Sequence, residues 1–442
     1  MSPTTRGWVV TLAGLGINLA LGVLYTWSVM AKALTRALAD GGTYAWSAQQ
    51  ANWPYAFAVG CFALTMVFAG RLQDRIGPRW VATAGGVMVG LGMVVASFSP
   101  ARLASSTAFP WTMVAGFGVM TGVGIGLAYA SATPAAVKWF PSWRKGTITG
   151  IVVAGFGLAS LYAAPLTTFL IRDFGVSRAF LVLGIGFLAV IVILAQLLAN
   201  PLPGYVPPGS YAERPARAPR MQASHDFTWQ EMVRTPSFYL LWGMYACAAF
   251  AGLMIIGIMA RVAALQLGAA VANTMSYVLV ATLALGNGLG RPLAGLISDR
   301  LGRQTTLLLV FVFQALMMLV LGVARTAPVL VFAAFFVGFN YGSNLTLFPA
   351  ATYDYFGTKN GGVNYGLVFT AWGVGGVFGS QLAAVIFDHS RTAANPAGSY
   401  AIAYAVAAAL LVVASALALA AHAPKDAPST QSPATDVAAT RA

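Results

Sequence analysis

Twelve apolar segments, each long enough to cross a bilayer as a helix of about twenty residues, dominate this sequence. Charged residues make up only 8% of the chain, against about 25% in soluble domains. We therefore predict an all-α membrane protein with twelve transmembrane helices in two six-helix bundles. The apolar segments cover approximately residues 8–31, 51–72, 80–98, 109–131, 146–170, 178–199, 236–260, 272–297, 304–323, 328–350, 363–387 and 399–421.

The sixth and seventh segments are separated by a stretch rich in Pro and Arg, which reads as a linker. We predict an N-terminal bundle over residues 1–199, a cytoplasmic linker over 200–235, a C-terminal bundle over 236–421 and a disordered cytoplasmic tail over 422–442. Ala37-Leu38-Ala39 resembles a signal-peptide cleavage site. The apolar run before it is longer than the 7–15 residues typical of such peptides, so we expect the segment to be retained.

The net charge of +14 would suggest nucleic acid as a partner of a soluble protein. In a membrane protein it fits loop charges that fix topology. With both termini and the linker in the cytoplasm, that side holds roughly twice as many Lys and Arg as the other, as the positive-inside rule requires. We therefore expect a multi-pass protein of the cell inner membrane and no binding of nucleic acid.

The two halves of the chain repeat a charged turn with the pattern G-x-x-x-D-R-x-G, once after the second segment and once after the eighth. Glycine allows close helix packing and tight turns. An aspartate at this place can bind a cation or a helix N-terminus. Repeated six-helix halves joined by a linker are typical of rocking transporters, so we interpret both turns as gates. The predicted gating residues are Gly70, Asp74, Arg75 and Gly77 in the first copy, and Gly295, Asp299, Arg300 and Gly302 in the second.

These turns resemble the signature loops of the major facilitator superfamily, and the resemblance covers essentially the whole chain. Further stretches are similar to the oxalate/formate antiporter family, which is related to the monocarboxylate transporters. They are Leu21–Ser28 (LGVLYTWS), Lys138–Pro141 (KWFP), Gly290–Leu293 (GRPL), Leu347-Phe348-Pro349 and Asn364-Tyr365-Gly366. The resemblance implies a membrane carrier of small carboxylates and no enzymatic activity.

Arg291 is the one cation that the pattern leaves inside the membrane. A charge at that depth costs at least roughly 2.5–3.5 kcal/mol and marks a functional site. Arg291 lies six residues before Ile297, about 9 Å along a helix, which is a marginal distance for reaching the surface. A guanidinium suits a carboxylate bidentately, and Arg291 matches the substrate-binding arginine of the resembled family. Asn287, one turn earlier, is placed to orient the arginine or the ligand.

The resembled antiporter carries a lysine in its eleventh span as a second cation for a dianion, and here that position is Trp372. One buried cation balances one carboxylate, and an uncompensated second charge is expensive. We therefore expect a monocarboxylate, with Trp372 and Phe369 as an apolar wall. Ordinary helix packing is the alternative reading of both aromatic residues.

Tyr25, Tyr129 and Tyr341 fall where the family has aromatic residues that line the cavity. A phenol can donate to a carboxylate and still pack against a short carbon chain. Each could instead belong to the interfacial belt. Phe156 stands where the family can have a tyrosine, so one polar contact is expected to be missing.

No acidic residue or histidine falls at mid-membrane, and Asp388 and His389 at the end of the eleventh segment are the nearest candidates for proton coupling. Two glycine strings, at residues 122–126 and 373–376, lack the strand that precedes a phosphate-binding loop and read as helix-packing sites. The two cysteines form no disulfide framework, and no residue pattern suggests catalysis, a metal site or a cofactor.

The sequence thus predicts a monomeric secondary transporter of small monocarboxylates of the lactate, pyruvate or formate type, working by alternating access. Its ligands are a small carboxylate anion and, if transport is proton-linked, protons; its surroundings are the lipid bilayer. Oxalate/formate exchange is one alternative. A non-transporting carboxylate sensor and a channel are two more, and the choice between proton symport and anion exchange stays open.

Overall fold

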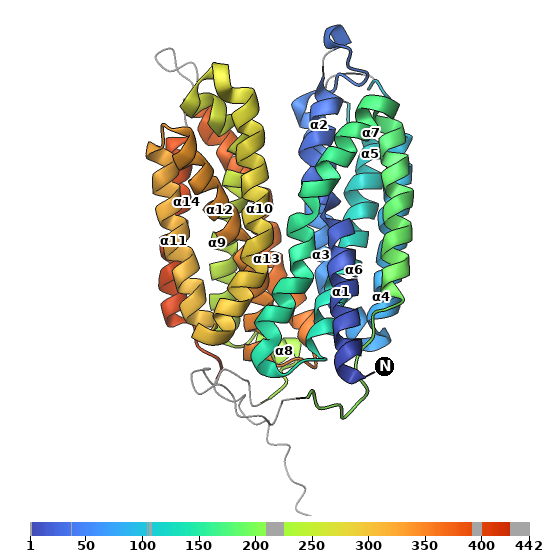
Figure 1. The fold of residues 1–442 in the computed structure, drawn as a ribbon, viewed down its shortest axis with the longest axis vertical. Coiled ribbons are helices and arrows are strands. Elements are labelled where there is room, and N and C mark those ends of the chain that lie inside the picture. The colour runs from blue at the N-terminus through green and yellow to red at the C-terminus, as the bar shows by residue number, and fades with distance from the viewer. Residues whose placement is uncertain are drawn as a thin grey trace, which may run out of the picture.

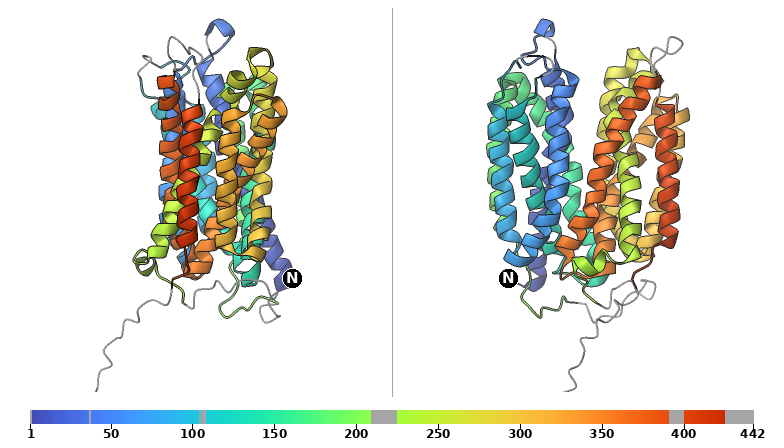
Figure 2. Two further views of the ribbon diagram at one scale, coloured as in Figure 1. Left: turned by 90° about the vertical axis from the view of Figure 1, so that its left-hand side faces the viewer. Right: turned by 180° about the vertical axis from the view of Figure 1, so that it is seen from behind.

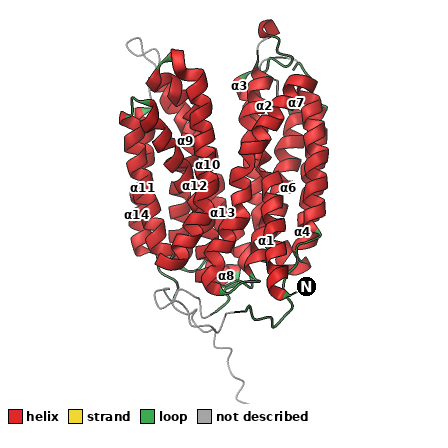
Figure 3. Ribbon diagram, in the orientation of Figure 1, coloured by secondary structure: helices red, strands yellow, loops and turns green. Residues whose placement is uncertain are grey.

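The computed structural model describes residues 2–36, 38–103, 105, 108–208, 225–390 and 400–424. Within them, Figure 3 shows helices joined by loops and no strand. Most of the predicted linker, residues 209–224, and most of the predicted tail, residues 425–442, lie outside the described residues. The domain boundaries given above therefore stay a prediction.

The first half of the chain forms the elements α1 to α7. Its helices are α1 (Pro3–Leu21), the 3-10 turn η1 (Gly22–Thr26), α2 (Trp27–Thr35), the short turn η2 (Leu38–Asp40), α3 (Ala48–Ile76), α4 (Pro78–Ser97), α5 (Trp111–Met113), the π-helical η3 (Val114–Thr121), α6 (Gly122–Val137), η4 (Ser142–Arg144) and α7 (Lys145–Ala195).

The second half follows a short helix at the end of the predicted linker, α8 (Trp229–Met232). Its helices are α9 (Pro236–Leu267), α10 (Ala269–Leu301), α11 (Arg303–Val323), α12 (Ala327–Phe356), α13 (Gly361–Ser390) and α14 (Ala401–Ala420).

The described residues contain nine stretches that are long and apolar enough to cross a membrane as helices. One of these, α7, comprises two crossings, because Gly175 has φ +81° and ψ +168° and interrupts its helical backbone. α10 and α13 are not among the nine, but they coincide with the eighth and eleventh apolar segments of the sequence. The protein therefore has twelve transmembrane helices, as the apolar pattern predicts.

Two glycines end one helix and begin the next where the repeated motif occurs. Gly77 has φ +91° between α3 and α4, and Gly302 has φ +90° between α10 and α11. Only glycine adopts this conformation without strain. The matching angles show that the sequence repeat is also a repeat of backbone geometry.

Figure 1 shows the helices in two groups, one made of α1–α7 and the other of α9–α14. The N-terminus and α8 lie at the end where the two groups meet, which we call the gate end. Toward the opposite end, the far end, the ribbons of the two groups diverge, and the view from behind in Figure 2 shows the same.

Glycines allow the two halves to touch backbone to backbone near the gate end. A Cβ atom added at Gly295 on α10 would collide with the carbonyl of Gly146 on α7. Likewise, a Cβ at Gly70 on α3 would collide with the carbonyl of Gly362 on α13. The first glycine of each motif copy therefore packs against a glycine that begins a helix in the opposite half.

Candidate substrate site and gates

Arg291 lies inside the protein on α10, and its side chain is 0% exposed. Asn287 is four residues earlier on the same helix face, and its Oδ1 accepts hydrogen bonds from Nε (3.3 Å) and Nη2 (3.1 Å) of Arg291. The amide thus orients the guanidinium, as the sequence spacing indicates. Snorkelling to the surface does not occur for Arg291 in this structure.

The third polar contact of the guanidinium crosses to the other half. Nη1 of Arg291 donates to the carbonyl oxygen of Val153 on α7 at 2.5 Å. Gly157 permits the approach, since a Cβ there would lie 2.9 Å from Nε of Arg291. Among the described residues, no carboxylate forms an ion pair with Arg291. The buried cation therefore has neutral partners only, and its charge is uncompensated.

A hydrogen-bonded row of aromatic side chains joins the halves close to this arginine. Nε1 of Trp372 on α13 donates to the hydroxyl of Tyr341 on α12 at 2.8 Å. The Tyr341 hydroxyl lies 3.4 Å from that of Tyr25, which belongs to η1 in the first half. Trp372 thus has a polar contact as well as the apolar ring that the sequence argument considered.

Further aromatic rings form a continuous packed group between the halves. Phe369 stacks on Trp372 with ring centroids 5.0 Å apart. It also lies 5.9 Å from Tyr129 of α6 and 5.1 Å from Phe62 of α3. The ring of Phe156 on α7 is 5.9 Å from the guanidinium carbon of Arg291, within the range of a cation–π contact.

The structure brings together all seven residues that the sequence analysis assigned to substrate binding, from η1, α6, α10, α12 and α13. Their role in binding stays a prediction. The sequence analysis missed the Val153 carbonyl and Phe62, and it treated Phe156 only as a lost polar contact. A carbonyl carries no residue-type signal, and Phe62 is one of 26 phenylalanines with nothing in the sequence to single it out.

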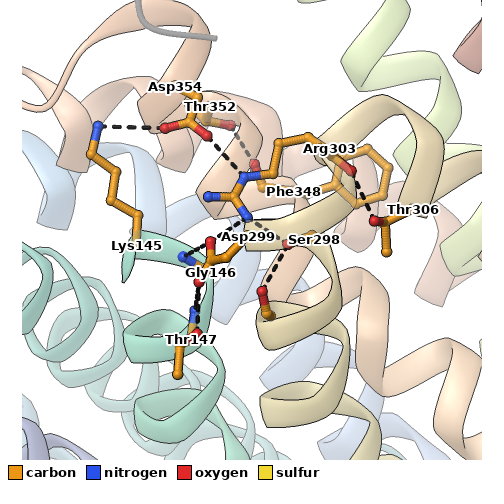
Figure 4. A network of polar contacts seen from close by, with 12 residues as sticks. Lys145, Gly146, Thr147, Ser298, Asp299, Arg303, Thr306, Phe348, Thr352 and Asp354 are labelled. Carbon is orange, nitrogen blue, oxygen red and sulfur yellow. Dashed lines mark hydrogen bonds and ion pairs between the residues drawn. The ribbon is translucent and has the colours of Figure 1, made fainter. Parts of the chain in front are cut away.

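The second motif copy joins the two halves at the gate end through Asp299. Its carboxylate accepts hydrogen bonds from the backbone amides of Gly146 (3.0 Å) and Thr147 (2.7 Å), and from Oγ1 of Thr147 (2.6 Å). These amides begin α7, so Asp299 of one half caps a helix N-terminus of the other (Figure 4). A carboxylate at a helix N-terminus is favoured by the helix dipole.

Two buried cations extend this contact into a network. Arg303 donates through Nη1 to Asp299 (2.7 Å) and through Nε to Asp354 at the end of α12 (2.8 Å). Lys145 lies 3.5 Å from the other oxygen of Asp354. Lys145 and Arg303 are both less than a tenth exposed, and Lys145 of the first half pairs with Asp354 of the second.

The first motif copy makes a smaller version of the same contact. Asp74 lies 3.7 Å from Nζ of Lys138, and its Oδ1 accepts a hydrogen bond from the neighbouring Gln73 side chain (2.5 Å). Its other oxygen faces the start of α13, 3.0 Å from the position of a Cβ on Gly362. Arg75 and Arg300, which the sequence analysis also assigned to the gates, are exposed and pair with no described carboxylate.

The part of the chain that the structure describes holds no group of three or more His, Cys, Asp or Glu side chains that could bind a metal ion. Cys61 and Cys247 are free thiols. The side chains of Asp388 and His389, which the sequence analysis considered for proton coupling, lie outside the described residues.

Two repeated halves, a buried cation between them and polar contacts that join the halves at one end are the features of a membrane carrier. The chain belongs to the major facilitator superfamily: the family model with that description matches residues 7–380 and 241–441.

Relatives of known sequence include three that match most of this chain. An uncharacterized MFS-type transporter of Escherichia coli (strain K12), YhjX, is 28% identical over 84% of this chain and 86% of its own length. The oxalate:formate antiporter of Oxalobacter formigenes is 28% identical over 86% of this chain and 85% of its own length. The apicoplast pyruvate carrier 1 of Toxoplasma gondii is 28% identical over 75% of this chain and 67% of its own length.

The fold is similar to that of solved transporters. The proton:xylose symporter XylE, bound to 6-bromo-6-deoxy-D-glucose, superposes with a TM-score of 0.68 and covers 95% of this chain and 96% of its own, at 13% identity. At this identity the likeness concerns the fold. By its family, the protein is a transporter of the superfamily and not an enzyme.

Proposed function

We propose that this protein is a secondary transporter that moves a small monocarboxylate, of the lactate, pyruvate or formate type, by alternating access. The observation that carries the proposal is the Arg291 guanidinium, fully buried between the halves with only neutral acceptors around it. A ligand carboxylate would supply the missing negative charge, and a guanidinium binds a carboxylate through two parallel hydrogen bonds.

The ligand is expected to carry one charge and to be small. Arg291 is the only cation of the described residues in this central region, and Trp372 stands where a second one would balance a dianion. The packed rings of Phe62, Phe156 and Phe369 would supply apolar contacts for a short carbon chain. These features support a monocarboxylate over oxalate, although one relative is an oxalate:formate antiporter.

We propose that the contacts of Asp74 and Asp299 hold the gate end closed in the state described here, and that the opposite state breaks them. The distribution of loop charge supports a cytoplasmic gate end, with both termini in the cytoplasm and the protein in the cell inner membrane. We further propose that it works as a monomer, because the site lies between the halves of one chain.

The proposal is tested by uptake of labelled L-lactate into proteoliposomes, with excess unlabelled pyruvate, formate or oxalate as competitor. Uptake that pyruvate or formate blocks and oxalate leaves unchanged supports it. Uptake that requires a preloaded anion and is blocked by oxalate supports instead the alternative, oxalate/formate exchange. Binding of L-lactate without any uptake would indicate a sensor.

Replacing Trp372 by lysine is expected to raise the affinity for oxalate relative to L-lactate by about tenfold, because a second cation would then face the second carboxylate. The ratio of the inhibition constants of the two anions, measured by competition, checks this. Trp372→Phe is the control, since it removes the hydrogen bond to Tyr341 without adding a charge. An unchanged ratio in Trp372→Lys would show that residue 372 does not face the ligand.

A further inference from the structure

Four tyrosines at the centre of the protein have buried hydroxyls that make no hydrogen bond of acceptable geometry with a described residue: Tyr129, Tyr245, Tyr353 and Tyr365. Each is at most 3% exposed. A buried hydroxyl without a partner destabilises the folded protein, and native proteins usually satisfy it with ordered water. Four such groups close together therefore call for a physical explanation.

These phenols are arranged in a file that leads from the central site toward the gate end. Tyr129 lies next to Phe156 and Phe369, at 5.6 and 5.9 Å between ring centroids. Tyr365 is one helical turn closer to the start of α13 than Phe369, and their rings are 5.6 Å apart. The ring of Tyr245 on α9 is 6.2 Å from that of Phe369, so Tyr129, Tyr245 and Tyr365 all surround this one phenylalanine.

The file of phenols continues to the first motif copy, at Asp74. The ring of Tyr353 on α12 lies 6.3 Å from that of Tyr365 and packs on Gly361, the first residue of α13. The Asp74 carboxylate faces the next residue of α13, Gly362, so Tyr353 and Asp74 contact adjacent residues at the start of this helix. From Phe369 to Gly362 the helix rises about 10 Å. The phenols thus bridge the distance between the ligand site and a carboxylate.

We propose that the hydroxyls of Tyr129, Tyr365 and Tyr353, with ordered water between them, form a proton relay from the central site to the Asp74 carboxylate. This inference rests on the proposed function and adds proton coupling to it. Phenols suit the task because a hydroxyl can accept a proton from one side while it donates its own to the other, with no net charge left behind.

The proton balance is simple. A proton that enters with the ligand carboxylate passes along the hydroxyls and waters, and each group gives one proton as it gains one. Asp74 takes up the last proton as a carboxylic acid and releases it at the gate end, where its side chain is 13% exposed. Lys138, Gln73 and the start of α13, on which Tyr353 also packs, are the groups that face Asp74.

The double variant Tyr353→Phe/Tyr365→Phe tests the relay, because neither residue belongs to the proposed ligand site. In proteoliposomes containing a pH-sensitive dye, the wild type is expected to take up L-lactate together with protons. In the double variant, the rate of this gradient-driven uptake is expected to fall about tenfold, whereas the rate of exchange of labelled for unlabelled L-lactate is expected to stay the same. Exchange needs no release of the proton to water, so it separates the relay from carboxylate transport itself.

Tyr404→Phe is the matched control, since Tyr404 on α14 is equally buried, at 3% exposure. Gradient-driven uptake that is unchanged in the double variant, or a wild type that exchanges L-lactate without moving protons, would overturn the relay and leave the proposed function intact. An equal loss of uptake and exchange would also overturn it, because the phenols would then guide the ligand. A higher Tm in the double variant with unchanged transport would show that the hydroxyls bind no water and take no part in proton transfer.

Discussion

Replacing Arg291 by alanine is expected to reduce L-lactate binding at least about 100-fold and to bring uptake to the background of empty liposomes. The reason is that a hydrogen-bonded, buried ion pair between guanidinium and carboxylate contributes roughly 2–5 kcal/mol to binding. Titration of the purified protein with L-lactate and uptake into proteoliposomes measure the two effects. Arg291→Lys is expected to recover little, because lysine lacks the planar fork that also reaches Asn287 and Val153.

Arg291→Ala is expected to fold, because it removes a buried charge whose only partners are neutral. Its Tm without ligand should stay within a few degrees of the wild type, while the rise in Tm on adding L-lactate should vanish. Arg102→Ala, at an exposed position that is assigned no role, is the control and should bind normally. Normal uptake by Arg291→Ala would refute the assignment of the site.

Replacing Asp299 by asparagine is expected to open the gate end. The substitution removes the negative charge at the start of α7 and leaves two cations, Lys145 and Arg303, with Asp354 alone. Breaking a buried pair in this way costs about 3–5 kcal/mol. If the closed and open states differ in free energy by a few kcal/mol, a change of this size nearly inverts the ratio of their populations. The population should therefore move from the state described here to one open at the gate end.

Spin labels at exposed gate-end positions, Arg75→Cys in one half and Arg300→Cys in the other, would measure this shift in a background without Cys61 and Cys247. The distance between the labels should lengthen in Asp299→Asn. It should not change in Asp173→Asn, which removes a surface pair with Arg172. An unchanged distance in Asp299→Asn would mean that this network does not hold the gate closed.

The two gates are not equivalent, and sequence alone could not show this. Both copies have the same motif, but Asp299 meets two backbone amides and Arg303, whereas the ion pair of Asp74 with Lys138 is looser. The difference comes from residues outside the motif. Asp354 ends α12, and Lys145 begins α7, so only the packing of these helices brings them to the second gate.

The sequence by itself determined the features that depend on local pattern. Hydropathy indicated twelve crossings, the repeat located both turns, and the lone intramembrane cation pointed to Arg291 with Asn287 one turn away. These follow from spacing along a single helix, because residues four apart share a face in any α-helix.

Only the tertiary structure decided what meets Arg291 and the phenols. Val153 is 138 residues from the arginine, and Tyr129 is 240 positions before Phe369 on the other side of the interface. Whether an aromatic residue of a membrane helix faces lipid, a neighbouring helix or the ligand path depends on how the helices cross. A chain in which nearly every helix face is apolar does not encode that choice in its hydrophobic pattern. It is fixed instead by glycines such as Gly146 and Gly295, which let two particular helix faces approach.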